Sequence, residues 1–220
     1  LVAPLGFLIG HAIQAKKSKL YMLMSTGLFL LLMTAVQYII SILFLNMNVL
    51  KQLITTIEVY YEQLGNIMSS FGQLPEGYDE LVEQSIMLIE SIMPSYFIGG
   101  VFISAWLYLI INLSLLKKLK LSVPKFPKFM DFRLPKAVLW YYLIVSIFSL
   151  FVSFDVGTFG YLALVNAALI LRALLFLQGV SLIHYYFYIE GWPKWSMILA
   201  TIFAVPLYTF TIIVGVLDLG

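Results

Sequence analysis

The chain has 220 residues, of which 62% are hydrophobic and only 11% are charged, and its mean hydropathy is +0.98. Soluble domains carry about 25% charged residues, so this composition excludes a soluble protein and predicts an integral membrane protein. The absence of cysteine excludes disulfides, thiolate metal sites and cysteine nucleophiles. Only two histidines, His11 and His184, are present, so we expect no histidine-rich metal site and no cofactor.

The apolar residues gather in long runs that predict membrane-spanning helices. Crossing a bilayer core of about 30 Å takes roughly 20 apolar residues. Residues 1–14 are also apolar, without an initiator Met or a basic n-region, and we interpret them as the end of a truncated helix that continues upstream. The five longer runs are 20–46, 95–116, 137–154, 158–187 and 195–217. Because none of the runs alternates, strands are excluded, and the predicted fold class is all-α: a polytopic membrane helix bundle of about six spans in a single domain over 1–220.

The charged residues predict the topology. Lysines follow the first run in loop 15–19, and segment 117–136 carries seven bases against one acid, Asp131. Segment 47–94 holds seven of the eleven acids and one base, Lys51. By the positive-inside rule, loops 15–19 and 117–136 are cytoplasmic and 47–93 is external in a multi-pass protein of the cell membrane. One span separates the acidic segment from each basic loop, as this topology requires.

The external segment 47–93 is predicted to form two amphipathic helices. In its first half, apolar residues recur at steps of three and four, which is the spacing of one helix face. They are Met47, Leu50, Ile54, Ile57, Tyr61, Leu64, Met68 and Phe71. A break follows at 72–77, after which Asp79 could cap a second helix that Pro94 ends before the next span. These helices either lie at the outer interface or fold over the mouth of the bundle.

The cytoplasmic loop 117–136 combines bases, aromatic residues and prolines. Prolines at 124, 127 and 135 forbid a regular helix. Phenylalanines interleave with the cations, a pattern suited to anionic lipid headgroups. Docking of a cytoplasmic partner is the alternative, whereas nucleic acid is not expected because no nucleic-acid-binding fold surrounds the loop. The candidate docking residues are Lys125, Phe126, Lys128, Phe129 and Arg133.

Arg172 lies at the centre of the run 158–187, and no run contains an acid to pair with it. A cation at this depth costs at least roughly 2.5–3.5 kcal/mol, so it is expected to face the protein interior. Gly179 on the same helix face would allow a second helix to approach closely. One interpretation is a structural cation satisfied by backbone carbonyls, by polar side chains or by an acid elsewhere. The other is an anion-binding residue, with Asn112, Asn166 and Gln178 as orienting groups.

No catalytic motif is present: the sequence has no His-Glu-x-x-His, Gly-x-Ser-x-Gly or Walker motif and no paired intramembrane aspartates. An enzyme is therefore not expected.

Four stretches of the C-terminal half resemble the YybS-type family of polytopic membrane proteins of Gram-positive bacteria. They are Pro127 with Phe132-Arg133-Leu134-Pro135, then Asn166, Leu177-Gln178-Gly179 and Leu217-Asp218-Leu219-Gly220. The resemblance implies a membrane bundle but brings no activity with it. Its six-span hydropathy is similar to that of the substrate-binding subunits of energy-coupling-factor transporters, an analogy of fold alone. The family's association with a membrane-anchored cyclic-dinucleotide phosphodiesterase implies a signalling or cell-envelope partner.

Two functional hypotheses follow. The leading one is a solute-binding or transport-related membrane subunit, with a cavity around Arg172 that takes a small anionic solute and is covered outside by 47–93. The alternative is a membrane scaffold or signalling partner that recruits a cytoplasmic protein or anionic lipid through loop 117–136.

Overall fold

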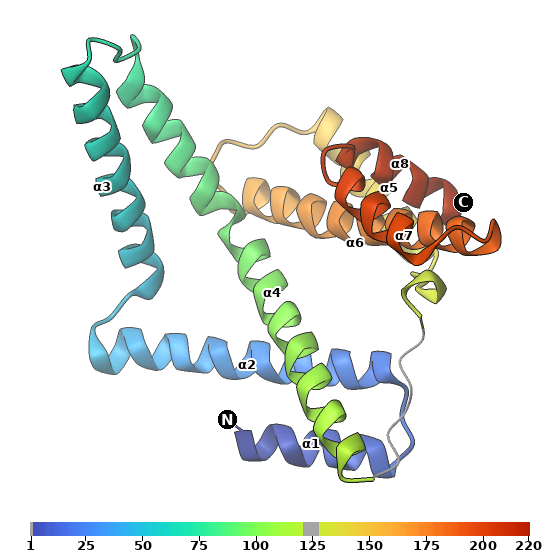
Figure 1. Ribbon diagram of the computed structural model, residues 1–220. Coiled ribbons are helices and arrows are strands. Elements are labelled where there is room, and N and C mark those ends of the chain that lie inside the picture. The colour runs from blue at the N-terminus through green and yellow to red at the C-terminus, as the bar shows by residue number, and fades with distance from the viewer. Residues whose placement is uncertain (1, 121–127) are drawn as a thin grey trace. The chain divides into compact units, whose positions relative to one another are not determined.

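A computed structural model describes residues 2–120 and 128–220, and every regular element in these ranges is a helix (Figure 1). The predicted all-α fold is confirmed. The chain divides into two compact units, residues 1–125 and 126–220, and each is described by itself. The assignment of 1–220 to one domain stays a prediction.

The first unit contains four helices: α1 (Val2–Gln14), α2 (Lys19–Leu45), α3 (Val49–Ser70) and α4 (Tyr78–Lys118). Polar side chains set two of the helix starts. Ser18 accepts a hydrogen bond from the Tyr21 amide before α2, and Asn48 accepts one from the Lys51 amide before α3. These caps satisfy amide groups that lack a partner in the first turn of a helix. Asn46 ends α2 in the left-handed conformation, with φ of 52°.

The core of this unit forms where α1, α2 and α4 meet. Ile9 and Ala12 of α1 pack against Met22 of α2 and against Leu109 and Leu113 of α4. Farther along, the ring of Phe102 on α4 lies over Gly27 of α2, so close that a Cβ at Gly27 would be 2.5 Å from it. The apolar run 1–14 is thus a helix packed into this unit.

The predicted amphipathic helices form a hairpin, in which α3 lies beside the first half of α4 (Figure 1). The eight apolar residues that recur from Met47 to Phe71 form a stripe along α3 and its flanks. Six of them are buried or half-buried, whereas the two at the ends, Met47 and Phe71, are exposed. The facing stripe of α4 is half-buried throughout: Val82, Ile86, Ile89 and Met93. The sequence periodicity therefore predicted the helical character of both segments and the apolar face of each, whereas their contact with each other was not predicted.

The tip of the hairpin is fastened by Tyr78. Its hydroxyl donates a hydrogen bond of 2.7 Å to the Tyr61 carbonyl oxygen, and its ring packs over Gly65. We expect Tyr78→Phe to weaken the hairpin by about 1 kcal/mol, because it removes this hydrogen bond and keeps the ring. Faster hydrogen exchange of α3 amides would report the loss. Tyr60→Phe is the matched control because Tyr60 is 63% exposed, and equal exchange in both variants would contradict the expectation.

Pro94 does not end a helix. Helix α4 runs unbroken through Pro94 and is 41 residues long in all, about 61 Å at 1.5 Å per residue. It joins the second amphipathic helix to the following span. Our prediction of a helix end at Pro94 was therefore wrong. A proline inside a helix removes only one backbone hydrogen bond, and in membrane proteins neighbouring groups often satisfy the freed carbonyl.

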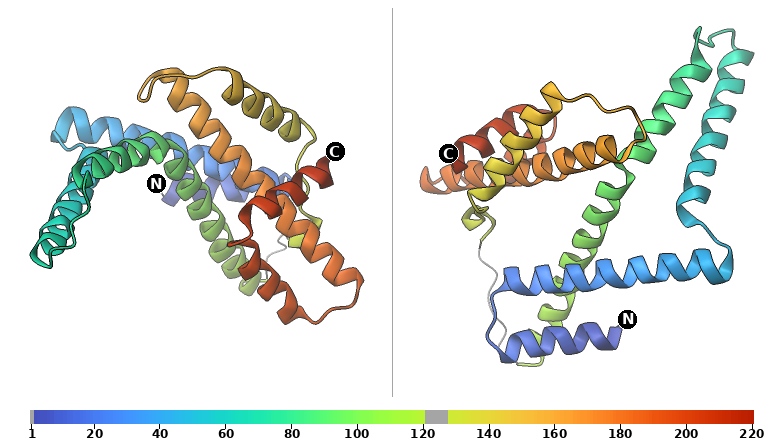
Figure 2. Two further views of the ribbon diagram at one scale, coloured as in Figure 1. Left: turned by 90° about the horizontal axis from the view of Figure 1, so that it is seen from above. Right: turned by 180° about the vertical axis from the view of Figure 1, so that it is seen from behind.

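The second unit is built around α6. Its elements are the 3₁₀ turn η1 (Phe129–Asp131), α5 (Ala137–Phe151), α6 (Phe159–Ile189), α7 (Lys194–Ala204) and α8 (Tyr208–Leu219). Helix α6 has α5 and α8 packed against it (Figure 2). Its core contains Leu175 of α6 and Ile212 and Leu219 of α8.

The run 195–217 is broken. The chain bends by 112° between α7 and α8, across residues 205–207, so the predicted run is not one continuous helix. Pro206 has no N–H to continue the helical ladder. Thr211 secures the bend, because its hydroxyl donates to the carbonyl oxygens of Leu207 and Ala204 at 3.1 and 3.3 Å. The pair is a broken span or a re-entrant segment.

Among the described residues, α2, α4 and α6 are long and apolar enough to cross a membrane, and the bent pair α7–α8 would make a fourth span. Helix α5 has 15 residues and rises about 22 Å, which is less than a bilayer core of about 30 Å. All six predicted runs are helical, but only three reach spanning length as single helices.

Candidate functional site

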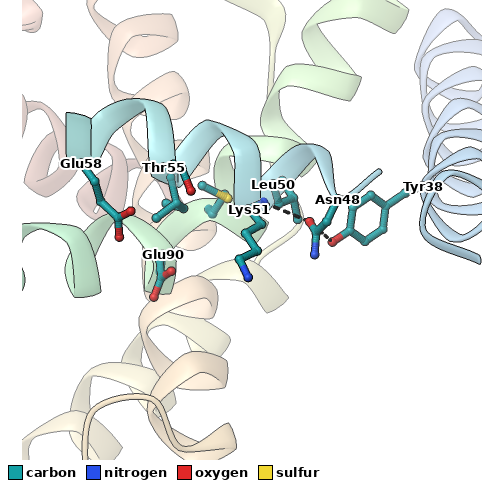
Figure 3. A pocket seen from close by; sticks show the side chains of 9 residues that line it. Tyr38, Asn48, Leu50, Lys51, Thr55, Glu58 and Glu90 are labelled. Atoms are coloured by element: carbon teal, nitrogen blue, oxygen red, sulfur yellow. Dashed lines mark hydrogen bonds between the residues drawn. The ribbon is translucent and has the colours of Figure 1, made fainter. Parts of the chain in front are cut away.

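A cleft of about 390 Å³ lies in the first unit at the base of the α3–α4 hairpin (Figure 3). It is lined by the end of α2, the first turns of α3 and the middle of α4. The lining residues are Tyr38, Asn48, Leu50, Lys51, Ile54, Thr55, Glu58, Glu90 and Met93. Ligand pockets usually measure about 300–1,000 Å³ and combine apolar walls with a few polar groups, and this cleft has both properties.

Three charged side chains give the cleft its electrostatic character. Lys51 and Glu58 are seven residues apart on α3, which places them two turns apart on one face. Both extend toward the side on which Glu90 of α4 stands (Figure 3). No ion pair within 4 Å joins these three residues. With two carboxylates and one ammonium group, the cleft carries a formal charge of −1.

Asn48 holds the wall of the cleft nearest α2. Its side-chain oxygen accepts from the Lys51 amide at 3.0 Å and from the Tyr38 hydroxyl at 3.2 Å (Figure 3). The N-cap of α3 is thereby tied to α2. This link positions Lys51 at the mouth of the cleft.

A second polar cluster, which we call the Gln178 lock, lies inside the second unit. The Gln178 side chain is 1% exposed. Its oxygen accepts from the Leu134 amide at 2.8 Å, and its nitrogen donates to the Asp218 carboxylate. The lock therefore joins α6 to α8 and to the segment before α5. A buried amide with both ends satisfied stabilises a packing arrangement, whereas an unsatisfied one would cost free energy.

The helices approach closely beside this lock. A Cβ atom at Gly179 would lie 2.0 Å from the Thr211 carbonyl oxygen, and one at Gly215 would lie 2.0 Å from the Leu175 carbonyl oxygen. The predicted close approach at Gly179 is confirmed, with α8 as the partner. Backbone contact of this kind is the usual way that membrane helices pack through small residues.

The end of the basic loop, from Lys128 to Phe132, is held against α6. Ser181 donates to the carbonyl oxygens of Phe129 and Phe132 at 2.8 and 3.0 Å. The Phe129 ring meets the His184 ring edge-on, with centroids 5.4 Å apart. Lys128 places its ammonium group 4.6 Å from the centre of the Tyr188 ring, a favourable cation–π arrangement.

Of the five candidate docking residues, Lys128, Phe129 and Arg133 are exposed. Lys125 and Phe126 lie outside the described residues. The exposed cations stand on a segment that Ser181 and Gln178 hold in place. A lipid or protein contact by these residues stays a prediction.

The four candidate ligand-binding residues are divided between the two units. Asn112 belongs to the first unit and the other three to the second. Asn112 donates to the Tyr108 carbonyl oxygen of its own helix, and Asn166 donates to that of Leu162. The Gln178 side chain is hydrogen-bonded to Leu134 and Asp218 in the Gln178 lock. Ligand binding by these residues stays a prediction.

Within the second unit, Arg172 is exposed on α6, and its orientation toward the interior of a complete bundle stays a prediction. It makes no hydrogen bond or ion pair with another residue of 128–220. Among the described residues of the second unit, one acid lies within an α-helix. It is Asp218 of α8, which accepts a hydrogen bond from Gln178. Because the run 195–217 stops one residue short of Asp218, the sequence reasoning missed this acid.

The cleft was also missed. Sequence reasoning placed 47–93 as a cover over Arg172 and gave Glu58 and Glu90 no role beyond topology. The available signal was the seven-residue spacing of Lys51 and Glu58 beside the apolar stripe of α3. The partner residue on α4 could not be found without the register of the hairpin.

The stretches that carry the family resemblance meet in the second unit. Leu134, Gln178 and Asp218 form the lock, Gly179 forms the close contact beside it, and Lys136 donates to the Gly220 carbonyl oxygen at 3.5 Å. Of the other residues in these stretches, Pro127 lies outside the described residues, and Arg133 and Leu217 are exposed. Asn166 lies elsewhere on α6.

Comparison with known proteins confirms the family resemblance. The chain is 28% identical to the uncharacterized protein YybS of Bacillus subtilis (strain 168) over 225 residues, which cover 98% of this chain and 71% of that protein. No solved structure matches the chain. Residues 1–219 match a family described as predicted membrane protein (DUF2232). The chain therefore belongs to the DUF2232 family of membrane proteins.

Proposed function

We propose that the protein is a solute-binding, transport-related membrane subunit whose solute site is the cleft between α2, α3 and α4. The observation that carries the proposal is the cleft itself, with a volume of about 390 Å³ and charged residues from two helices. The sequence has no Walker motif, so coupling of transport to ATP hydrolysis would come from a separate subunit.

The charges of the cleft select the class of solute. Glu58 and Glu90 favour a positively charged group, and Lys51 adds a contact for one anionic group. Tyr38 and Thr55 offer hydroxyl groups, whereas Leu50, Ile54 and Met93 offer apolar contact. We therefore expect a small cationic or zwitterionic solute, such as an amine or an amino acid, in place of the anion expected from Arg172.

The position of the cleft in the chain also supports solute capture from outside. Positive-inside sorting puts the acidic hairpin on the external side. The cleft lies where this hairpin joins α2 and the apolar part of α4. A solute bound there would sit next to the membrane-spanning helices.

The test is a thermal-shift screen of the detergent-purified full-length protein against amino acids, polyamines, vitamins and small carboxylates. We expect a cationic or zwitterionic compound to stabilise the wild type, by about 2.7 kcal/mol at 100 times its Kd. Glu58→Gln and Glu90→Gln should weaken binding at least about tenfold, which corresponds to roughly 1.4 kcal/mol. Glu83→Gln is the matched control, because Glu83 is an exposed α4 acid two turns before Glu90 that does not line the cleft.

Two results would contradict the proposal. One is a compound that stabilises the cleft variants and the wild type equally. The other is stabilisation by small carboxylates alone that Arg172→Leu abolishes, because this would return the site to Arg172.

A specific observation favours the scaffold as a second candidate. The exposed Lys128 and Arg133 stand on a segment that side chains of α6 fix in place. Such a fixed basic surface suits an anionic lipid or a cytoplasmic protein, since the cost of ordering it is already met within the fold. Reduced binding of Arg133→Gln to vesicles containing anionic lipid, with solute binding unchanged, would support this role.

A further inference from the structure

The cleft between α2, α3 and α4 holds its three charged side chains at different points along α3. All of its lining residues belong to the first unit, so their placement does not involve the second unit. Lys51 and Glu58 stand seven residues apart on α3, about 10.5 Å along the helix axis. Glu90 of α4 lies between them in the direction of α3 (Figure 3). An elongated solute with several charged groups fits this arrangement better than a compact ion does.

The three charged side chains are available to a solute. None of them forms a side-chain hydrogen bond or an ion pair with another residue of 2–120. The turn of α3 that carries Lys51 is fixed, because the Lys51 amide donates to the Asn48 side chain at 3.0 Å. The cleft therefore offers one cationic contact and two anionic contacts.

We propose that the solute of the cleft is a dibasic amino acid, such as lysine or ornithine, which carries one carboxylate and two ammonium groups. This inference rests on the proposed function and names its substrate class. The α-carboxylate and the α-ammonium share one carbon atom, so they need neighbouring contacts of opposite sign, which are Lys51 and Glu90. The terminal ammonium pairs with Glu58, farther along α3. The solute charge of +1 compensates the cleft charge of −1.

The apolar lining accounts for the carbon chain between the two ends of such a solute. Leu50, Ile54 and Met93 line the same cleft and are buried or half-buried. Long cationic molecules place their methylene groups along apolar surface while the charged ends keep polar contacts. The combination of apolar wall and three separate charges is the pattern that a dibasic amino acid needs.

Other small solutes leave one charge of the cleft without a partner. A neutral amino acid has a single ammonium group, so one of the two carboxylates stays unpaired. A diamine has no carboxylate, so Lys51 stays unpaired and repels the nearer ammonium group of the solute. Specificity then follows from the penalty that each mismatched solute meets.

The experiment is isothermal titration calorimetry of the full-length protein in detergent, at neutral pH and low ionic strength. The probes are L-lysine and three analogues that each lack one charged group. Cadaverine lacks the carboxylate, 6-aminohexanoate lacks the α-ammonium and norleucine lacks the terminal ammonium. We expect L-lysine to bind roughly five- to tenfold more tightly than each analogue, because each analogue loses one charge pair.

Variants of the cleft connect each charged group of the solute to one side chain. Lys51→Met should remove the preference for L-lysine over cadaverine. Glu90→Gln should remove the preference over 6-aminohexanoate, and Glu58→Gln the preference over norleucine. Glu83→Gln, which changes an exposed α4 acid outside the cleft, should keep all three preferences.

Three outcomes would overturn the inference, and they separate it from the proposed function. If an analogue binds as tightly as L-lysine and Glu58→Gln weakens it, the cleft binds a solute but not a dibasic one. If L-lysine binds equally to the wild type and to all three variants, its site lies outside the cleft. If L-lysine does not bind, the dibasic class is excluded, and the wider thermal-shift screen decides whether the cleft binds any solute.

Discussion

Replacing Gly179 by leucine is expected to disrupt the packing of α6 against α8 in the second unit. Its Cβ would lie 2.0 Å from the Thr211 carbonyl oxygen and 3.1 Å from the Gly215 amide nitrogen. These are backbone atoms, so no side-chain rotation can relieve the clash. Overpacking costs typically about 1–3 kcal/mol, and a forced separation of two helix backbones should reach roughly 3 kcal/mol or more.

The measurement is denaturant unfolding of the purified protein in detergent, followed by tryptophan fluorescence. Gly100→Ala is the control, since a Cβ there has no neighbouring atom within 4 Å. This control should be neutral or slightly stabilising because alanine favours helices over glycine by about 1 kcal/mol. Equal stability of Gly179→Leu and the wild type would show that α6 and α8 are not in backbone contact.

The apolar pattern predicted the helices because it reflects a local property of the chain. The stripe from Leu50 to Met68 has the period of a helix, and the facing stripe from Val82 to Met93 has the same period. The helices themselves therefore needed no information about distant residues, whereas their pairing in a hairpin was not predicted.

The sequence did not predict correctly where the apolar helices continue and where they bend. Pro94 and Pro206 both stand in apolar surroundings, yet α4 continues through the first and the run 195–217 bends by 112° near the second. At the bend near Pro206, the Thr211 hydroxyl donates to the carbonyl oxygens of Leu207 and Ala204. Hydrophobic periodicity does not predict this contact.

The candidate site shows the same limit. Gln178 was noticed because an amide in an apolar run is costly unless paired. Its partners, Leu134 and Asp218, are 44 and 40 positions away in the chain, so sequence spacing could not distinguish a ligand contact from an internal one. Arg172 was noticed for a similar reason, but its depth along α6 was predictable whereas its side chain's surroundings were not.

The Gln178 lock provides the last test, because its energetics separate a structural role from a ligand-binding role. Gln178→Leu leaves the Leu134 amide without its acceptor and the Asp218 carboxylate without its donor. Each unsatisfied group costs about 1–3 kcal/mol, so we expect a loss of roughly 2–5 kcal/mol. Trypsin should also cleave faster after Lys128 and Arg133, since the segment before α5 loses its hydrogen bond to α6.

A double-mutant cycle of Gln178→Leu with Asp218→Leu measures the coupling free energy between the two side chains. Removing both partners should cost less than the sum of the single losses, with a coupling of about 0.5–3 kcal/mol, because neither group is then left without the other. Asp218→Asn should be mild, since an amide oxygen can still accept from Gln178. Additive losses with unchanged cleavage would mean that Gln178 is not holding the two elements together. The amide would then again be available to a ligand, as the sequence first suggested.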